Sequence, residues 1–426
     1  MHLQSAKSFW LLAGVAGLGL IVFGSVWMTS VFARFEKVPV DWEQADELVG
    51  TFTFVDEAFL AELQGNSTIA GLMSSPAALG LLAQPEVSSL LGSPALAELL
   101  ESPDLLAALQ DPNLSIADLL QSGLAATLAG RPQLMELLAD PAVVALLGNE
   151  VVQTLLADPA ALSLLVNEKT QALLANPADL PMVTVAVEIR RQRTATGAEG
   201  DRLFITELTS TVDPATGQKV PGFEPTELKL VVDRVSKEYL SGTEGGRSGF
   251  WGLPFHVDKS RSFSTWVTAA GRPLDAAYLG TEELQGLETY LYGIDVTNLA
   301  LGSDDPATGL PLVVDAKITT WNEPKTGSTV RIEDFDAISA LAPSGEKYPR
   351  FVADVSHPPD TVSRLVDDAK GNRGMIIVFG TYMPWAAIGL GLILALAAGA
   401  VTLRGLKEGS PERPSPSPVP EPSPTS

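Results

Sequence analysis

The sequence predicts an α+β protein: a mostly antiparallel β domain that carries an inserted array of short α-helices and is flanked by two transmembrane helices. Three observations support this fold class. Uncharged apolar runs lie near both ends of the chain, β-branched segments separated by turn residues lie between them, and prolines recur every nine residues in one part of that region. These patterns are typical of membrane spans, strands and short helical repeats respectively.

The first apolar run covers residues 9–33 and contains no charged residue. A helix rises about 1.5 Å per residue, so this run can cross the roughly 30 Å hydrocarbon core of a bilayer. Trp10 and Trp27 fall near the two expected interfaces. The alternative is a cleaved signal peptide with its cleavage site at Val31 to Ala33, but the run is longer than a usual signal core.

The second uncharged run covers residues 374–403. Pro384 marks the expected start of its helix, because proline is tolerated in a first helical turn, and the predicted span is 384–403. A buried core helix is the alternative, which the length of the run disfavours. Small residues such as Gly17 and Gly399 permit close helix packing, and we expect the two spans to pair with each other.

Two spans place both termini on the same side of the cell membrane. Arg404 and Lys407, after the second span, favour a cytoplasmic tail. We therefore predict that residues 1–8 and 404–426 are cytoplasmic and that the domain between the spans, 34–373, is extracytoplasmic. The tail is rich in proline and serine, so we expect it to be disordered.

The composition of the chain excludes several classes of function. Of its 426 residues 46% are hydrophobic, which is enough for a sizeable core. A formal net charge of −23 argues against nucleic acid as a partner, because a phosphate backbone is bound by basic patches. The sequence contains no cysteine, which excludes disulfides, thiolate zinc sites and a cysteine nucleophile.

Residues 66–180 contain the nine-residue repeat, in which most prolines follow Ser, Asp or Asn and precede a leucine pair. This order is typical of a helix N-cap and a first helical residue, and the next proline ends the helix. Each unit is therefore a helix of about two turns, too short to be stable alone. Because the prolines break the helix, successive leucine pairs can share one side, which is the predicted apolar-ligand face. That face comprises Leu81, Leu82, Leu90, Leu91, Leu99, Leu100, Leu137, Leu138, Leu146, Leu147, Leu155 and Leu156.

The repeat resembles the DP-type helical repeats of co-chaperones and ubiquitin-shuttle proteins. That resemblance implies a groove that cradles a hydrophobic helix, so a lipid or a hydrophobic helix is the partner it predicts. The alternative is a closed array whose leucines pack on one another, as apolar stripes at helical spacing usually do.

The β domain begins with a strand at residues 51–55, before the repeat, and continues after Pro181. Alternating β-branched segments separated by turn signals predict its other strands. These lie at 183–189, 203–208, 228–234, 289–296, 312–321 and 329–332. Long helical crossovers are absent from the sequence pattern, which favours an antiparallel sheet or barrel with the repeat as an insertion.

Several longer motifs occur in this domain. They read VVDRVSKEYLSG from Val231, RSGFWGLPFHVDKSRSFSTWV from Arg247, YLGTEELQGLETYLYGIDV from Tyr278, WNEPKTG from Trp321 and TVSRLVDDA from Thr361. In these motifs and both spans the chain resembles the actinobacterial two-span envelope family labelled porin PorA. The resemblance implies a membrane protein with an extracytoplasmic domain. Two apolar helices cannot enclose a pore alone, so a pore would require several copies of the chain. The layout also resembles that of scavenger-receptor lipid-binding proteins, as an analogy of architecture alone.

The sequence offers little catalytic chemistry. His256 and the neighbouring Asp258 could form a base held by a carboxylate, but a strand residue with a satisfied ring is the favoured interpretation. Neither a nucleophile elbow nor a phosphate loop occurs. Paired acids at 304–305 and 367–368 could bind a cation weakly, and solvated surface acids are the favoured reading. We therefore predict no catalytic, cofactor or metal site and a protein that is not an enzyme.

The sequence thus favours a membrane-anchored extracytoplasmic binding protein of the cell envelope, with a lipid or another apolar molecule as its ligand. The alternative is a subunit of an oligomeric envelope channel. A hydrolase acting on the envelope is a third reading, which the missing motif disfavours. The oligomeric state stays open at this point.

Overall fold

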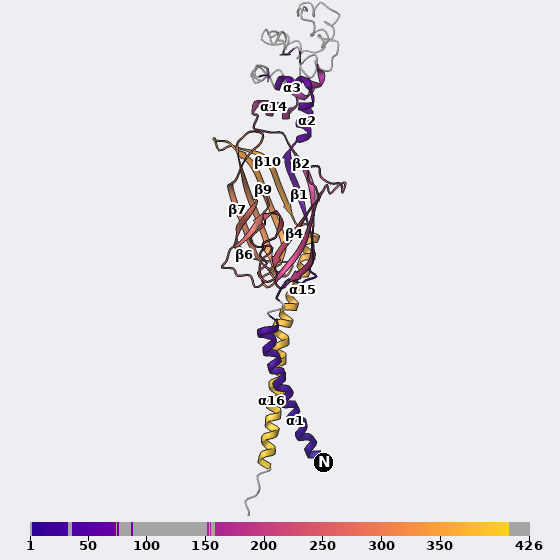
Figure 1. The fold of residues 1–426 in the computed structure, drawn as a ribbon, viewed down its shortest axis with the longest axis vertical. Helices are drawn as coiled ribbons and strands as arrows, with labels where there is room; N and C mark the ends of the chain where they lie inside the picture. Colours follow the sequence, from indigo (N-terminus) through magenta and orange to yellow (C-terminus); the bar gives the residue numbers. More distant parts are fainter. Residues whose placement is uncertain are drawn as a thin grey trace, which may run out of the picture.

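The computed structural model describes residues 2–32, 36–73 and 158–408, together with the single positions 75, 87, 151, 152 and 154. The described part is elongated, with a β-barrel in the middle (Figure 1). A pair of long helices extends from one end of the barrel, and short helices cover the other end. The fold class is therefore α+β, as the sequence predicts.

The described strands form one ten-stranded antiparallel sheet in the order β4-β3-β2-β1-β10-β9-β8-β7-β6-β5. Neighbours in the sheet are also neighbours in sequence, except where β1 pairs with β10. The strands are β1 (Glu43–Val55), β2 (Met182–Glu199), β3 (Arg202–Val212), β4 (Thr226–Asp233), β5 (Phe263–Val267), β6 (Arg272–Leu284), β7 (Leu287–Asp304), β8 (Pro311–Asn322), β9 (Thr329–Leu341) and β10 (Lys347–Ser356).

The two edges of the sheet, β4 and β5, are joined through the segment 237–251. Tyr239 bridges to Val232 of β4, and Phe250 bridges to Thr265 of β5. The two parts of the segment are bonded to each other, since the Tyr239 amide donates to the Gly249 carbonyl at 2.9 Å. The backbone ladder therefore runs around the barrel, which leaves neither edge strand open.

Side chains alternate between the inside and the outside of the barrel. Inward positions form apolar clusters, of which the largest surrounds Phe263 and Tyr292. Outward positions of the central strands are mostly polar, as at the exposed Glu47, Thr51 and Asp354, and Phe335 is an exposed apolar exception. An outer face of this kind is suited to water, whereas a transmembrane barrel presents an apolar band to lipid.

Helix α1 (His2–Val26) and helix α16 (Met383–Glu408) lie side by side and project from the barrel (Figure 1). Two stretches of the described residues, Leu12–Val31 and Pro359–Arg404, contain helix long and apolar enough to cross a membrane. The pairing is close, because a Cβ on Gly17 would lie 2.6 Å from the carbonyl oxygen of Gly391. Gly17 thus packs as expected, whereas a Cβ on Gly399 would meet no described atom within 4 Å.

Helix α15 (Pro359–Ile377) joins the barrel to the second span. Its buried residues Val362, Leu365 and Val366 pack against Leu287 and Trp321 of the barrel. The helix then continues through a π-helical turn, Val378–Tyr382, into α16. The expectation that a helix begins at Pro384 is therefore wrong. A proline inside a helix removes one backbone bond and crowds the preceding turn, and the wider π-helical turn accommodates it.

The short helices lie at the barrel end opposite the spans (Figure 1). They are α2 (Glu57–Gly65), α3 (Ser67–Met73), α13 (Pro159–Leu165) and α14 (Glu168–Ala175). Asp158 caps α13 by accepting from the amides of Ala160 and Ala161, both at 3.1 Å, with Pro159 as the first helical residue. In this unit the predicted Asp-Pro helix start is confirmed, and its Leu165 is buried.

The insertion leaves and re-enters the barrel at adjacent points. Val55, the last residue of β1, pairs with Met182, the first residue of β2. The next pair is also bonded, since the Asp56 amide donates to the Pro181 carbonyl at 2.8 Å. Residues 57–180 therefore occupy the tip of a β-hairpin.

Candidate functional site: a cleft at the membrane end of the barrel

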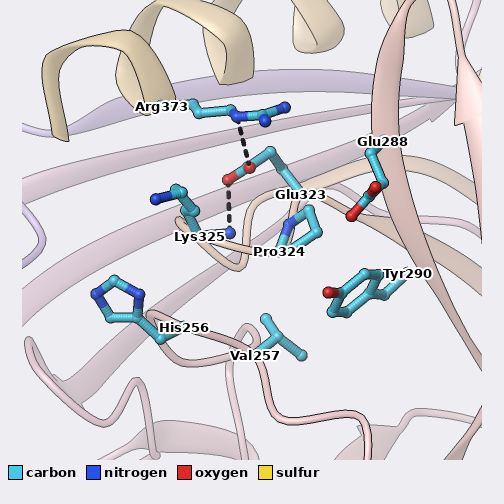
Figure 2. A pocket seen from close by; sticks show the side chains of 8 residues that line it. All are labelled: His256, Val257, Glu288, Tyr290, Glu323, Pro324, Lys325 and Arg373. Atoms are coloured by element: carbon cyan, nitrogen blue, oxygen red, sulfur yellow. Dashed lines mark hydrogen bonds and ion pairs between the residues drawn. The ribbon is translucent and has the colours of Figure 1, made fainter. Parts of the chain in front are cut away.

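A cleft of about 300 Å³ lies where the barrel meets α15 (Figure 2). Four segments that are distant in sequence line it: the loop before β5, strand β7, the turn between β8 and β9, and helix α15. The lining residues are His256, Val257, Glu288, Tyr290, Glu323, Pro324, Lys325 and Arg373. Apolar and charged side chains therefore share one small space.

The barrel domain joins both apolar runs beside this cleft. Arg373 is the last charged residue before the apolar run that begins at Gly374. His256 contacts Glu36, three residues beyond the first apolar run, with 2.8 Å between Nε2 and Oε1. If both runs cross a bilayer, the cleft lies at the depth of the lipid headgroups.

The turn between β8 and β9 holds a carboxylate rigidly in the wall of the cleft. Oε2 of Glu323 accepts from the amides of Lys325 at 3.0 Å and Thr326 at 2.6 Å, and from Thr326 Oγ1 at 2.8 Å. Gly327 closes the turn at φ 66°, and a Cβ there would lie 2.1 Å from the Leu253 carbonyl oxygen. The motif WNEPKTG thus folds into a turn that only glycine can complete at this position.

Glu323 is fully buried, at 0% exposure, yet only half of its carboxylate is satisfied. Among the described residues Oε1 has no hydrogen-bond partner. The nearest cation is Arg373, whose Nε lies 3.8 Å from Oε1, too far for a hydrogen bond (Figure 2). A buried carboxylate oxygen without a donor is costly, so this atom favours an additional donor in the cleft.

A second buried charge lies beneath the same turn. Lys237 Nζ donates to the Thr326 carbonyl at 2.5 Å and lies 4.6 Å from the centre of the Phe255 ring. Burial lowers the pKa of Lys237 to about 7, and the charge of Glu323 opposes that shift. The turn is therefore held by the Glu323 carboxylate and the Lys237 amine, both buried in the barrel.

The polar side chains of the cleft are unevenly placed. His256, Lys325 and Arg373 lie on one side of it, and Glu288 lies with Tyr290 on the other (Figure 2). Lys259 also lies near the wall of Glu288 and Tyr290, with its Nζ 4.4 Å from the Tyr290 ring centre, but the acidic Glu288 lies on that wall. An anionic group is therefore best placed on the side of Lys325 and Arg373.

The barrel interior contains a second group of charged residues. In one part of this group the acids are paired with arginines. Arg191 donates to both carboxylate oxygens of Asp46, at 2.9 and 2.8 Å. Glu207 accepts from Arg193 at 2.6 Å and from Arg247 at 2.9 Å. Burial opposes the ionisation of Asp46, but Arg191 and Arg193 outweigh it and hold its pKa at about 2.

Two other acids inside the barrel have a carboxylate oxygen without a hydrogen-bond partner among the described residues. Asp334 and Asp336 lie two residues apart on the inward face of β9, and Oδ1 of each has no partner among the described residues. Burial raises the pKa of Asp334 to about 6, against the charge of Arg191. Burial and the charge of Asp334 raise the pKa of Asp336 to about 7. Burial therefore disfavours the charged form of both carboxyls.

Comparison with known proteins assigns the chain to a family. A family profile described as Porin PorA matches residues 133–401, which include the cleft and every strand but β1. The chain belongs to the Porin PorA family. No curated protein matches the sequence. The family match confirms the resemblance seen in the motifs, and together with the two candidate spans it identifies a membrane protein.

The predicted apolar-ligand face of this Porin PorA protein lies outside the described residues. This applies to all twelve leucines from Leu81 to Leu156, so that face stays a prediction. The interpretation of His256 as a strand residue is wrong, since it lies in a loop at φ 55° with its ring bonded to Glu36 rather than Asp258. Asp305 pairs with Arg350 at 2.9 Å, which removes it as a cation ligand. Within the described ranges no three His, Asp or Glu side chains are grouped to hold a metal ion.

Proposed function

We propose that this Porin PorA family chain is a membrane-anchored extracytoplasmic binding protein of the cell envelope, whose ligand is a lipid or another molecule with an apolar body. The observation that carries the proposal is the cleft between the barrel and α15, at the point where the chain enters its second apolar run. Its location lets a ligand reach the site from the membrane without crossing the barrel.

The lining of the cleft supports an amphipathic ligand. Val257, Tyr290 and Pro324 supply apolar and aromatic surface, while Lys325 and Arg373 supply charge. Ligand sites commonly combine apolar walls with a few placed polar groups. A volume of about 300 Å³ holds a headgroup and the start of a chain, so the remainder of a lipid would stay in the bilayer.

The test is lipid extraction and mass spectrometry on the full-length protein purified in detergent. The wild type is expected to retain lipid in a fixed molar ratio. Glu288→Trp fills the cleft at an exposed position and should lower that ratio. Glu47→Trp, an exposed substitution on the outside of β1, is the matched control and should not. The proposal fails if the wild type carries no more lipid than its detergent micelle explains.

A second function, a subunit of an oligomeric channel, is supported by the description of the family. One chain supplies two apolar helices, which pair with each other, and the outer face of its barrel is mostly polar. A pore would therefore require several copies that meet through the outer faces of α1 and α16, where Leu12 and Leu396 are exposed. Planar-bilayer recording on the purified protein tests this function, which requires reproducible unitary conductance.

A further inference from the structure

We propose that the cleft is a headgroup site for a phospholipid whose headgroup carries a hydrogen-bond donor: the phosphodiester lies against Lys325 and Arg373, and the donor bonds to Oε1 of Glu323. This inference rests on the proposed function and narrows its ligand class. Ethanolamine, glycerol and inositol headgroups have the required N–H or O–H group. A choline headgroup has the same phosphodiester and no donor.

The anionic half of the headgroup is assigned to the basic side of the cleft. Arg373 reaches this side from α15, and Lys325 reaches it from the turn between β8 and β9 (Figure 2). The guanidinium of Arg373 makes no hydrogen bond to Glu323, because Nε is 3.8 Å from Oε1. It can therefore turn toward a phosphate, which guanidinium groups bind with paired donors. The net charge of −23 makes such a local basic site necessary for an anion.

The donor half follows from the orphaned oxygen of Glu323. Oε2 already has three donors from the turn, which fix the carboxylate, whereas Oε1 has none among the described groups. The side chain is fully buried, so water does not compete freely for Oε1. When Arg373 moves onto the phosphate, a headgroup N–H or O–H takes its place beside Oε1. A charged acceptor of this kind discriminates strongly against a ligand that lacks the donor.

The remaining side chains of the cleft agree with this arrangement. Glu288 faces the basic side across the cleft and provides a second acceptor for an ammonium or hydroxyl group (Figure 2). Tyr290 lies beside it and offers apolar surface to the glycerol end of the lipid. The His256 ring bonds to Glu36, which links the cleft lining to the segment that follows the first apolar run.

The experiment measures binding of full-length protein to nanodiscs doped with one phospholipid at a time. Phosphatidylethanolamine and phosphatidylglycerol are expected to bind about ten- to a hundredfold more tightly than phosphatidylcholine, the range expected for one hydrogen bond to a charged group. Glu323→Gln replaces the acceptor Oε1 by an amide that can turn its NH₂ to the cleft, so it should abolish this preference while the chain stays folded.

Arg373→Gln should weaken binding of every phospholipid by about tenfold, because a charge-assisted contact to the phosphate is lost. Lys317→Gln, at an exposed position on the outside of β8, is the matched control and should change neither affinity nor preference. Circular dichroism and gel filtration confirm that each variant is folded.

The outcomes separate the two proposals. Equal binding of all three phospholipids by the wild type overturns the headgroup assignment and leaves the binding function in place. Failure to bind any of them overturns the headgroup assignment, whereas the binding function is overturned only if the purified protein also carries no lipid beyond that of its detergent micelle. Soluble glycerophosphoethanolamine is the further arm: if it binds as tightly as the intact lipid, the site recognises a free phosphodiester, and the assignment to a membrane lipid is overturned.

Discussion

Replacing Asp336 with asparagine should stabilise the protein at pH 8, although the substitution lies inside the barrel. Asp336 is 8% exposed, and its cross-strand neighbours on β8 and β10 are Ala316 and Ala353, which offer no donor. Of the charged groups inside the barrel, Asp334 repels it, and the charge of Arg191 acts on Asp334. The carboxylate is therefore buried without compensation.

The sign and the magnitude follow from the pKa. The ordinary value is 3.8 and the folded value is about 7, so the folded protein binds the proton more tightly by about 3 pKa units. The contribution of protonated Asp336 to the free energy of unfolding is then full below pH 4 and is lost as the pH rises to about 7. Each unit corresponds to about 1.4 kcal/mol, which sets an upper limit of about 4 kcal/mol. We expect Asp336→Asn to recover about half of it, or about 2 kcal/mol.

The assay is thermal unfolding of the purified protein between pH 4 and pH 8, followed by circular dichroism. Asp336→Asn should raise the melting temperature by about 4–8 °C at pH 8 and leave it nearly unchanged at pH 4. Asp315→Asn is the control of opposite sign, because Lys347 bonds to Asp315 at 2.6 Å and the pKa of Asp315 is lowered. That variant should lose stability at pH 8. If Asp336→Asn instead destabilises the protein most at pH 8, Asp336 has a cationic partner and the reasoning is wrong.

Three further outcomes are expected. Gly17→Leu should disrupt the pairing of the spans and lower thermal stability in detergent, whereas Gly19→Leu, where a Cβ meets no described atom within 4 Å, should not. Arg191→Met leaves the buried Asp46 without its main partner and should cost about 3–5 kcal/mol in denaturant unfolding at pH 7, with a smaller loss at pH 2. A single cysteine at Ser344, in the turn between β9 and β10, should react with an impermeant maleimide on whole cells, while one at residue 4 should not; labelling of both or of neither contradicts the proposed orientation.

The strands with regular alternation were predictable from the sequence. The segments that the pattern indicated at 183–189, 203–208, 289–296 and 312–321 lie within β2, β3, β7 and β8, which extend beyond them. Strands β6 and β10 were not predicted, because RPLDAAYLGTEEL and KYPRFVADVS contain proline, glycine or acids that interrupt the pattern. In β10 the register shifts between Pro349 and Phe351, where a bulge accommodates the proline. These two segments form strands because they pair with neighbouring strands, and that information is not present in the local sequence pattern.

The candidate site was less accessible to prediction. Its lining comes from segments spread over more than a hundred residues, from His256 to Arg373, and no spacing rule joins them. The buried acids are a further example, since alternating acids in a strand usually indicate its solvent face. In β9 the acids Asp334 and Asp336 lie inside the barrel, and Phe335 between them is exposed. The one available signal was WNEPKTG, in which an acid precedes a tight glycine turn.

Because the hairpin between β1 and β2 is closed at its base, residues 57–180 form an insertion that the barrel does not require. Because Val55 and Met182 are already paired, a two-residue turn could replace the whole segment without moving a strand. The entropy of closing a loop grows only slowly with its length, so units of nine residues can be gained or lost at little cost to the barrel. Evolution can therefore vary the outer end of this protein in length while the cleft near the membrane stays the same.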